Sequence, residues 1–115
     1  MHEWSLALEI IKIGEKEATL RKARSVAEVE IRLGKLNNIV KDQLVEAFEI
    51  AKNDTLLSSA VLHVVEVSAK ARCGKCEKDF EIELPLIYCP NCGNMDISVE
   101  SGEEMHFSKV VLDFD

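Results

Sequence analysis

The sequence lacks an excess of positive charge and lacks any long hydrophobic run. Its 115 residues include 14 Lys or Arg and 21 Asp or Glu, which gives a net charge of −7. Because nucleic-acid-binding proteins gain affinity from Lys and Arg, this balance argues against a phosphate backbone as the main partner. No apolar run approaches the roughly 18 residues that a membrane-spanning helix needs. A secretory signal peptide is not expected, because Glu3 and Glu9 would lie inside it and no small-residue cleavage site follows an apolar core. We therefore predict a cytoplasmic protein.

The sequence also lacks the residue patterns of common active sites. It contains no nucleophile–base constellation, no glycine-rich phosphate loop and no open metal site beside a general base. We therefore predict that the protein is not an enzyme. Apart from two cysteine pairs, it shows no internal repeat and no low-complexity tract.

Apolar patterning predicts two helices and three strands in the main part of the chain. The sequence VEIRL at residues 29–33 alternates apolar and charged side chains, as in a half-buried strand. A second helix is expected to begin near Asn38. Residues 60–67 and 105–114 are expected to form two further strands. The first helix is expected over residues 3–24, with an apolar face of Trp4, Leu8, Ile11, Ala18 and Leu20.

A change of composition between about Ala69 and Gly102 predicts a second, inserted module. Apolar residues become fewer there, and both cysteine pairs and both prolines of the chain fall within this segment. We predict an α/β domain made of residues 1–69 and 103–115, interrupted by a small domain of residues 70–102.

The four cysteines are the strongest local pattern in the sequence. Cys73 and Cys76 form one CxxC pair, and Cys89 and Cys92 form another after twelve intervening residues. Two residues between cysteines allow a tight turn to direct both sulfurs at one tetrahedral ion, and two such turns make the closed four-thiolate site of structural zinc. Two disulfides or two redox-active pairs are the alternatives, and a reducing cytosol favours metal. A catalytic zinc is not expected, since no coordination position stays open.

The surroundings of the cysteines favour a structural role for this module. Gly74 and Gly93 are expected to relieve steric crowding in the two turns. A module of this size cannot bury enough surface by itself, so metal binding should supply its folding free energy. Residues 70–102 contain four basic and six acidic residues, which favours a protein contact or a structural prop over nucleic-acid binding.

The opening residues Met1, His2 and Glu3 form a second candidate metal site. If Met1 is retained, as the bulky His2 favours, the α-amine, the His2 amide nitrogen and the His2 Nδ1 can close two fused chelate rings on one ion. The α-amine titrates near ~8 and can yield its proton to a metal. A near-planar nitrogen array suits Ni(II) or Cu(II), and Glu3 adds a carboxylate. The alternative is a solvated helix start at which Glu3 complements the helix dipole.

Five segments occur in one order over the whole chain: MHEWSLA, EIRLGKLNN, LVEAFEIA, CGKC with CPNCG, and SGEEMHFSKVVLDFD. In this combination the sequence resembles the HypA/HybF family of hydrogenase nickel-incorporation proteins. The resemblance implies an α/β nickel domain with a small three-stranded sheet and two helices, plus an inserted four-cysteine zinc-ribbon domain. It also implies a metallochaperone that binds Ni(II) through Met1, His2 and Glu3 and delivers it to the large subunit of NiFe hydrogenase. The implied partner in delivery is a maturation GTPase.

Two positions depart from the usual family pattern. Gly34-Lys35 stands where relatives usually have Gly-Glu, and Val40 stands where an acidic residue is frequent, so nickel coordination is expected to differ in detail. The alternative function is a zinc-ribbon adaptor that binds proteins or nucleic acid without nickel transfer, which leaves the opening tripeptide unexplained. We expect a monomer or homodimer that binds neither nucleic acid nor membrane.

Overall fold

The structure is a computed structural model that describes residues 2–82, 87–102 and 104–114. The elements of these residues are α1 (His2–Leu20), β1 (Ser25–Gly34), α2 (Lys41–Ala51), β2 (Val61–Val67), β3 (Lys70–Cys73), β4 (Asp79–Glu81), β5 (Ile97–Ser101) and β6 (Met105–Asp113).

The chain forms two compact units. The first unit comprises Met1–Arg32, Asn38–Val65 and His106–Asp115, and the second comprises Leu33–Asn37 and Glu66–Met105. The second unit thus includes a short segment at the end of β1 as well as the cysteine region. The domain boundaries predicted from the sequence, 1–69 with 103–115 and 70–102, stay a prediction.

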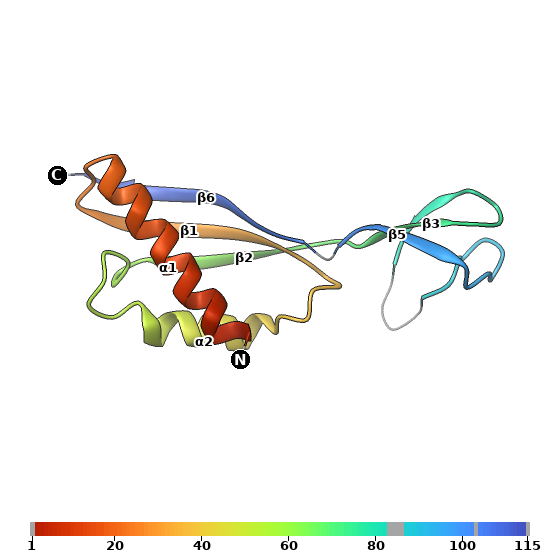
Figure 1. Cartoon of the computed structure of the whole chain (residues 1–115), viewed down its shortest axis with the longest axis horizontal. Coiled ribbons are helices and arrows are strands. Elements are labelled where there is room, and N and C mark those ends of the chain that lie inside the picture. Colours follow the sequence, from red (N-terminus) through yellow and green to blue (C-terminus); the bar gives the residue numbers. More distant parts are fainter. Residues whose placement is uncertain (1, 83–86, 103, 115) are drawn as a thin grey trace. The chain divides into compact units, whose positions relative to one another are not determined.

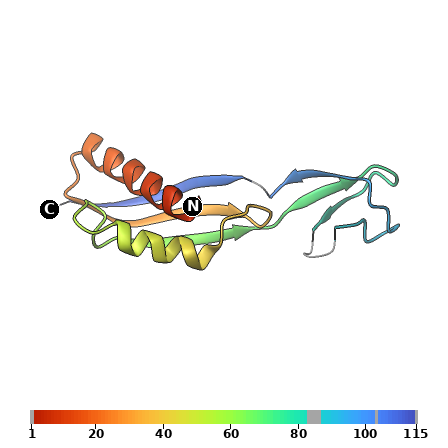
Figure 2. The same ribbon diagram turned by 60° about the horizontal axis from the view of Figure 1, so that its bottom comes forward.

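The first unit contains a three-stranded sheet of order β2-β1-β6, with α1 and α2 over one face (Figures 1 and 2). Along β1, Val29 and Ile31 are fully buried, whereas Glu28 and Arg32 are exposed. Successive side chains of a strand point to opposite faces, so this alternation directs the apolar residues at the helices. The strand predicted from VEIRL is confirmed, although it is longer than the sequence pattern indicated.

Helix α1 packs through small and branched residues. The apolar face predicted from the sequence is only partly correct, because Trp4, Leu8 and Leu20 are exposed by 37%, 46% and 68%. The residues at the packed face recur at spacings of three and four along the helix, as one face of a helix requires. They are Ala7, Ile10, Ile11, Gly14 and Ala18.

Gly14 allows α1 to approach the segment after α2 closely. A Cβ atom at this position would lie 2.9 Å from Cδ2 of Leu57, which is itself fully buried. Glycine usually weakens a helix interior, and here it leaves room for a core side chain. Helix α2 contributes Leu44 and Phe48, both fully buried, to the core of this unit.

The second unit has its own antiparallel sheet of order β4-β3-β5 and a very small core. The central strand β3 pairs Ala71 with Phe80 on one side and with Val99 on the other. The core consists of Ala69, Ala71 and Ile82, with Leu36, Phe80 and Ile97 packed against it. Such a core is too small to account for a stable fold by burial alone.

The predicted fold class is confirmed: two helices, a three-stranded sheet, and a second small sheet with four clustered cysteines. Among the described residues, neither helix is long and apolar enough to cross a membrane.

We expect Phe48→Ala to lower the free energy of unfolding by about 3–5 kcal/mol, because it leaves a cavity under α2. Ile50→Ala is the matched control on the same helix, since Ile50 is 59% exposed; its expected effect is within about 0.5 kcal/mol. Urea unfolding followed by circular dichroism measures both. Equal effects of the two substitutions would contradict the assigned core.

Candidate metal centres

The four cysteines converge in the second unit. Their Sγ atoms all lie within 4.8 Å of one another. The sulfur of Cys73 is 3.6 Å from that of Cys92, and the sulfur of Cys76 is 3.6 Å from that of Cys89. A disulfide needs about 2.05 Å between sulfurs, so the cysteines are not paired as disulfides here.

These distances fit one tetrahedral metal ion. A tetrahedral ion with metal–sulfur bonds of about 2.3 Å, the length for zinc, separates its sulfurs by about 3.8 Å. The close pairs join a cysteine of one CxxC turn to a cysteine of the other, so both turns are needed for the site. With four sulfurs around the ion, no coordination position remains for substrate.

Each CxxC turn contains the same kind of backbone hydrogen bond, from the fourth residue after its first cysteine back to that cysteine. The carbonyl of Cys73 accepts the amide of Glu77 at 3.0 Å, and the carbonyl of Cys89 accepts the amide of Gly93 at 2.8 Å. The donor residues have matching left-handed backbones, with φ of 60° at Glu77 and 77° at Gly93. This equivalence makes the cysteine region a pair of similar turns facing one ion.

The two turn glycines serve different purposes. The crowding expected at Gly74 is present, because a Cβ atom there would lie 2.9 Å from Oδ2 of Asp96, whose carbonyl accepts the Gly74 amide at 2.9 Å. At Gly93 the expected crowding is not found, since a Cβ atom there would have no described atom within 4 Å, and glycine is favoured instead by the left-handed backbone. In the first turn Glu77 adopts this left-handed conformation.

Backbone amides are directed at the sulfur of Cys73. The amides of Lys75 and Cys76 each lie 3.4 Å from this Sγ, and the side-chain amide of Asn94 lies 3.9 Å away. The Cys76 amide, opposed by burial and assisted by the Lys75 amide, lowers the pKa of the Cys73 thiol to about 6. The lowered pKa favours the thiolate of Cys73, the form that binds metal.

In the second pair, the pKa values of the two thiols shift in opposite directions. Burial raises the pKa of the Cys89 thiol, but amide donors from Cys92 and Asn91 outweigh it and leave the pKa below its usual value. The Asn94 amide lowers the pKa of the Cys92 thiol, yet burial and the three neighbouring thiols raise it overall, to about 11. Four sulfurs this close cannot all carry a charge without a cation between them, so the arrangement favours a bound metal ion.

The N-terminal candidate site lies in the first unit, at the start of α1. His2 is the first residue of the helix and is exposed, and Met1 lies outside the described residues. Glu3 is half-buried, and its Oε2 accepts the backbone amide of Val40 at 3.0 Å. This hydrogen bond is the largest of the influences that lower the pKa of the Glu3 carboxyl, so Glu3 is ionised at neutral pH.

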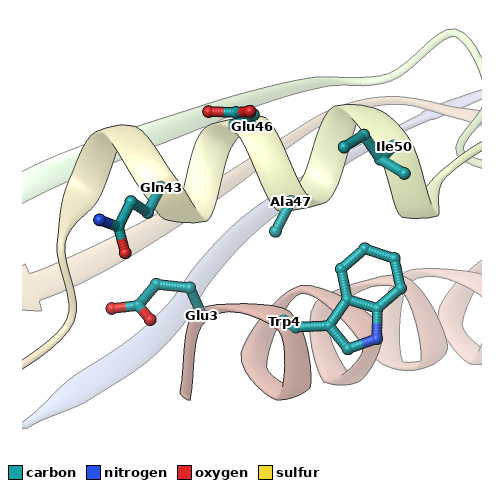
Figure 3. Close-up of a pocket in the computed structure, with 6 residues that line it drawn as sticks. All are labelled: Glu3, Trp4, Gln43, Glu46, Ala47 and Ile50. Carbon is teal, nitrogen blue, oxygen red and sulfur yellow. The ribbon is translucent and has the colours of Figure 1, made fainter. Parts of the chain in front are cut away.

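A groove between α1 and α2 opens beside Glu3 (Figure 3). Its volume is about 250 Å³, and Trp4 faces Ala47 and Ile50 across it, while Gln43 lies next to Glu3. Glu46 completes the lining. The start of α1 is thus bordered by an apolar surface with two carboxylates.

Sequence reasoning missed three of these features. The contact of the Val40 amide with Glu3 could not be inferred, because every residue except proline has a backbone amide. The contact of Asn94 with the Cys73 sulfur could not be inferred either, because several polar residues lie near the cysteines in the sequence. The groove requires α1 and α2 to pack side by side, which no local pattern specifies. The clustering of the four cysteines was inferred, because it depends on local spacing.

Comparison with known proteins identifies the family. The family model described as "HypA: Hydrogenase/urease nickel incorporation, metallochaperone, hypA" matches residues 1–112. The chain belongs to the HypA family. The hydrogenase maturation factor HypA of Chlorobium limicola is 34% identical over 113 residues, which are 98% of this chain and 97% of the relative.

Solved HypA structures share the fold. The solution structure of the Ni metallochaperone HypA from Helicobacter pylori has a TM-score of 0.67 and 23% identity, and covers 98% of both chains. A second structure, described as the solution structure of HypA protein, has a TM-score of 0.71 and 24% identity, and covers 97% of this chain and 96% of the other. HypA proteins are metallochaperones for nickel incorporation, and this chain is a member with a four-cysteine metal site. The predicted family is confirmed.

Removing the metal ion should unfold the second unit and spare the helices. The core of that unit is three small or medium residues, so the ion must provide much of its folding free energy. We expect a strong chelator to collapse the dispersed amide resonances of residues 66–105, with little loss of helical circular dichroism. Unchanged resonances in protein shown to be metal-free would contradict this dependence.

The pH dependence of metal retention follows from competition between protons and Zn(II) for all four sulfurs. Without metal the pKa of Cys92 is about 11 and that of Cys73 is about 6, so Cys92 is the sulfur that protons take up most readily and Cys73 keeps its charge down to about pH 6. We expect zinc to be retained at pH 7 and released as the pH falls below about 6. A zinc-sensitive dye measures release, with His2→Ala as the control that removes the terminal histidine. Release with a midpoint above pH 7 would contradict this expectation.

Proposed function

We propose that this HypA-family protein carries Ni(II) at its N-terminus, with Met1, His2 and Glu3 as ligands. The observation that carries the proposal is the position of His2 and Glu3 in the first turn of α1, with His2 exposed and the Glu3 carboxylate bonded to the Val40 amide. An imidazole, a carboxylate and the α-amine of Met1 would provide three different donors for one ion. Nitrogen and oxygen donors of this kind suit nickel.

The nickel site and the cysteine site suit different tasks. A delivery protein must bind its cargo and then exchange ligands with an acceptor. Exposed ligands at a chain terminus allow an acceptor to approach the ion, whereas four sulfurs around one ion leave no position open for exchange. We therefore assign the cargo role to the terminus and the structural role to the cysteines.

We propose that Cys73, Cys76, Cys89 and Cys92 hold Zn(II) as a structural ion. The support is the sulfur separation of 3.6 Å between the turns, close to the value for zinc, and the small core of the unit. No step of nickel transfer is assigned to this ion. Residues 70–102 then act as a zinc-ribbon domain, and residues 1–69 with 103–115 act as the nickel domain.

The proposed acceptor is the large subunit of NiFe hydrogenase, with a maturation GTPase as the partner in delivery. The family description of hydrogenase and urease nickel incorporation supports this assignment. The protein would bind and hand over the ion in the cytoplasm, without catalysing a reaction. Glu3 and Trp4 line the groove, so a partner that binds in it would contact the first turn of α1.

Substitution of His2 tests the nickel site. With a native, untagged N-terminus, we expect one Ni(II) to bind per chain and His2→Ala to abolish binding, because the imidazole anchors the chelate rings. Isothermal titration calorimetry on zinc-loaded protein measures this.

His63→Ala is the matched control, since His63 is an exposed histidine of the same unit and pairs with Glu28 at 2.8 Å. We expect this variant to bind nickel like the unchanged protein. A Gly-Ser extension before Met1 moves the α-amine away and should also abolish binding. Undiminished affinity in His2→Ala would reject the terminal site.

A further inference from the structure

Helix α2 begins at a residue that cannot cap it. Val40 is the N-cap residue, with φ of −87° and ψ of 115°, and it makes no side-chain cap hydrogen bond. Serine, threonine, aspartate and asparagine are preferred at this position because their oxygen accepts an amide of the first turn. Valine has no such oxygen, so this side-chain cap is missing at the start of α2.

The main chain of the N-cap residue is instead bonded by the carboxylate of Glu3. Its Oε2 accepts the Val40 amide at 3.0 Å, although the two residues are 37 positions apart in the chain. The carboxylate therefore lies at the N-terminal end of α2, where the helix dipole favours negative charge. The contact joins the first turn of α1 to the start of α2 within the first unit.

We propose that the backbone amide of Val40 positions Glu3 for nickel, by holding Oε2 while Oε1 is directed to the ion. An ionised carboxylate has about four lone-pair positions on two oxygens, so it can accept an amide and bind a metal together. The inference rests on the proposed function, because it requires nickel at Met1, His2 and Glu3. Val40 is thus a positioning residue that acts through its main chain.

The physical advantage of this arrangement is that the Val40 amide restrains a ligand side chain near the end of the chain. Terminal residues are usually poorly ordered unless something restrains them. A ligand side chain that is already restrained loses less conformational freedom when it binds, which raises affinity. Groups that orient metal ligands by hydrogen bonding typically change metal affinity by about 10–100-fold.

Val40→Pro removes the amide hydrogen and keeps the Glu3 carboxylate. The φ of −87° lies near the range that proline adopts, and the Val40 carbonyl still accepts the Leu44 amide at 3.0 Å. Val40→Ala is the matched control, because it removes a side chain that is 49% exposed and keeps the amide. Both are tested on zinc-loaded protein with a native N-terminus.

We expect Val40→Pro to weaken Ni(II) binding by about 10-fold or more in calorimetry, and Val40→Ala to stay within about twofold of the unchanged protein. Zinc content and helical circular dichroism should be the same in all three proteins. Equal affinities of the two variants would overturn the positioning role. Tighter binding by Val40→Pro would also overturn it, since it would show that the amide and the ion compete for Glu3.

A second measurement covers the case in which Val40→Pro does not fold. Hydrogen–deuterium exchange by mass spectrometry follows a peptide that includes residue 40. In the unchanged protein, nickel should slow exchange there, and Glu3→Ala should exchange faster than Glu3→Gln, whose amide oxygen can still accept the hydrogen bond. Faster exchange on nickel addition would overturn the proposal.

The two levels of inference fail in different ways. Absence of nickel binding by the unchanged protein, or intact binding by His2→Ala, rejects the terminal nickel site itself. Loss of binding in His2→Ala together with equal affinities of Val40→Pro and Val40→Ala keeps that site and rejects only the role of the Val40 amide.

Discussion

Backbone amides directed at negatively charged ligand atoms are the interaction on which both candidate metal centres depend. In the second unit, the amides of Lys75 and Cys76 lie 3.4 Å from the sulfur of Cys73. In the first unit, the Val40 amide binds the carboxylate of Glu3. In each case the donor belongs to the main chain, and its hydrogen bond favours the ionised form of the group that accepts it.

The two units differ in the size of their cores. The first unit has a core of fully buried side chains, among them Ile10, Ile31 and Phe48. The core of the second unit is only Ala69, Ala71 and Ile82, and its four cysteine sulfurs lie within 4.8 Å of one another. A metal that maintains a fold must stay bound, whereas a cargo metal must leave. In the proposed assignment the two ions belong to separate units, so that nickel could be lost while the cysteine site stays intact.

The fold was predictable where the deciding information is local. The alternation at Val29 and Ile31 indicated a strand with one buried face, and the CxxC spacing indicated two turns facing one ion. Prediction was poorer for α1, where Trp4 and Leu8 were placed on the packed face. The packed face instead contains Gly14, where a side chain would collide with Leu57. Hydrophobicity alone does not show at which positions of a helix only a very small residue fits.

The sequence by itself determined the metal chemistry: which residues carry sulfur, imidazole and carboxylate, and which of them lie near one another along the chain. It also determined the family, since the five motifs occur in one order along the chain and the family model matches residues 1–112. Only the tertiary structure decided that Glu3 meets Val40 and that Glu77, not Gly74, adopts the left-handed backbone in its turn. The physical reason is that every residue except proline carries an amide. Which amide meets which ligand depends on packing between segments far apart in the sequence.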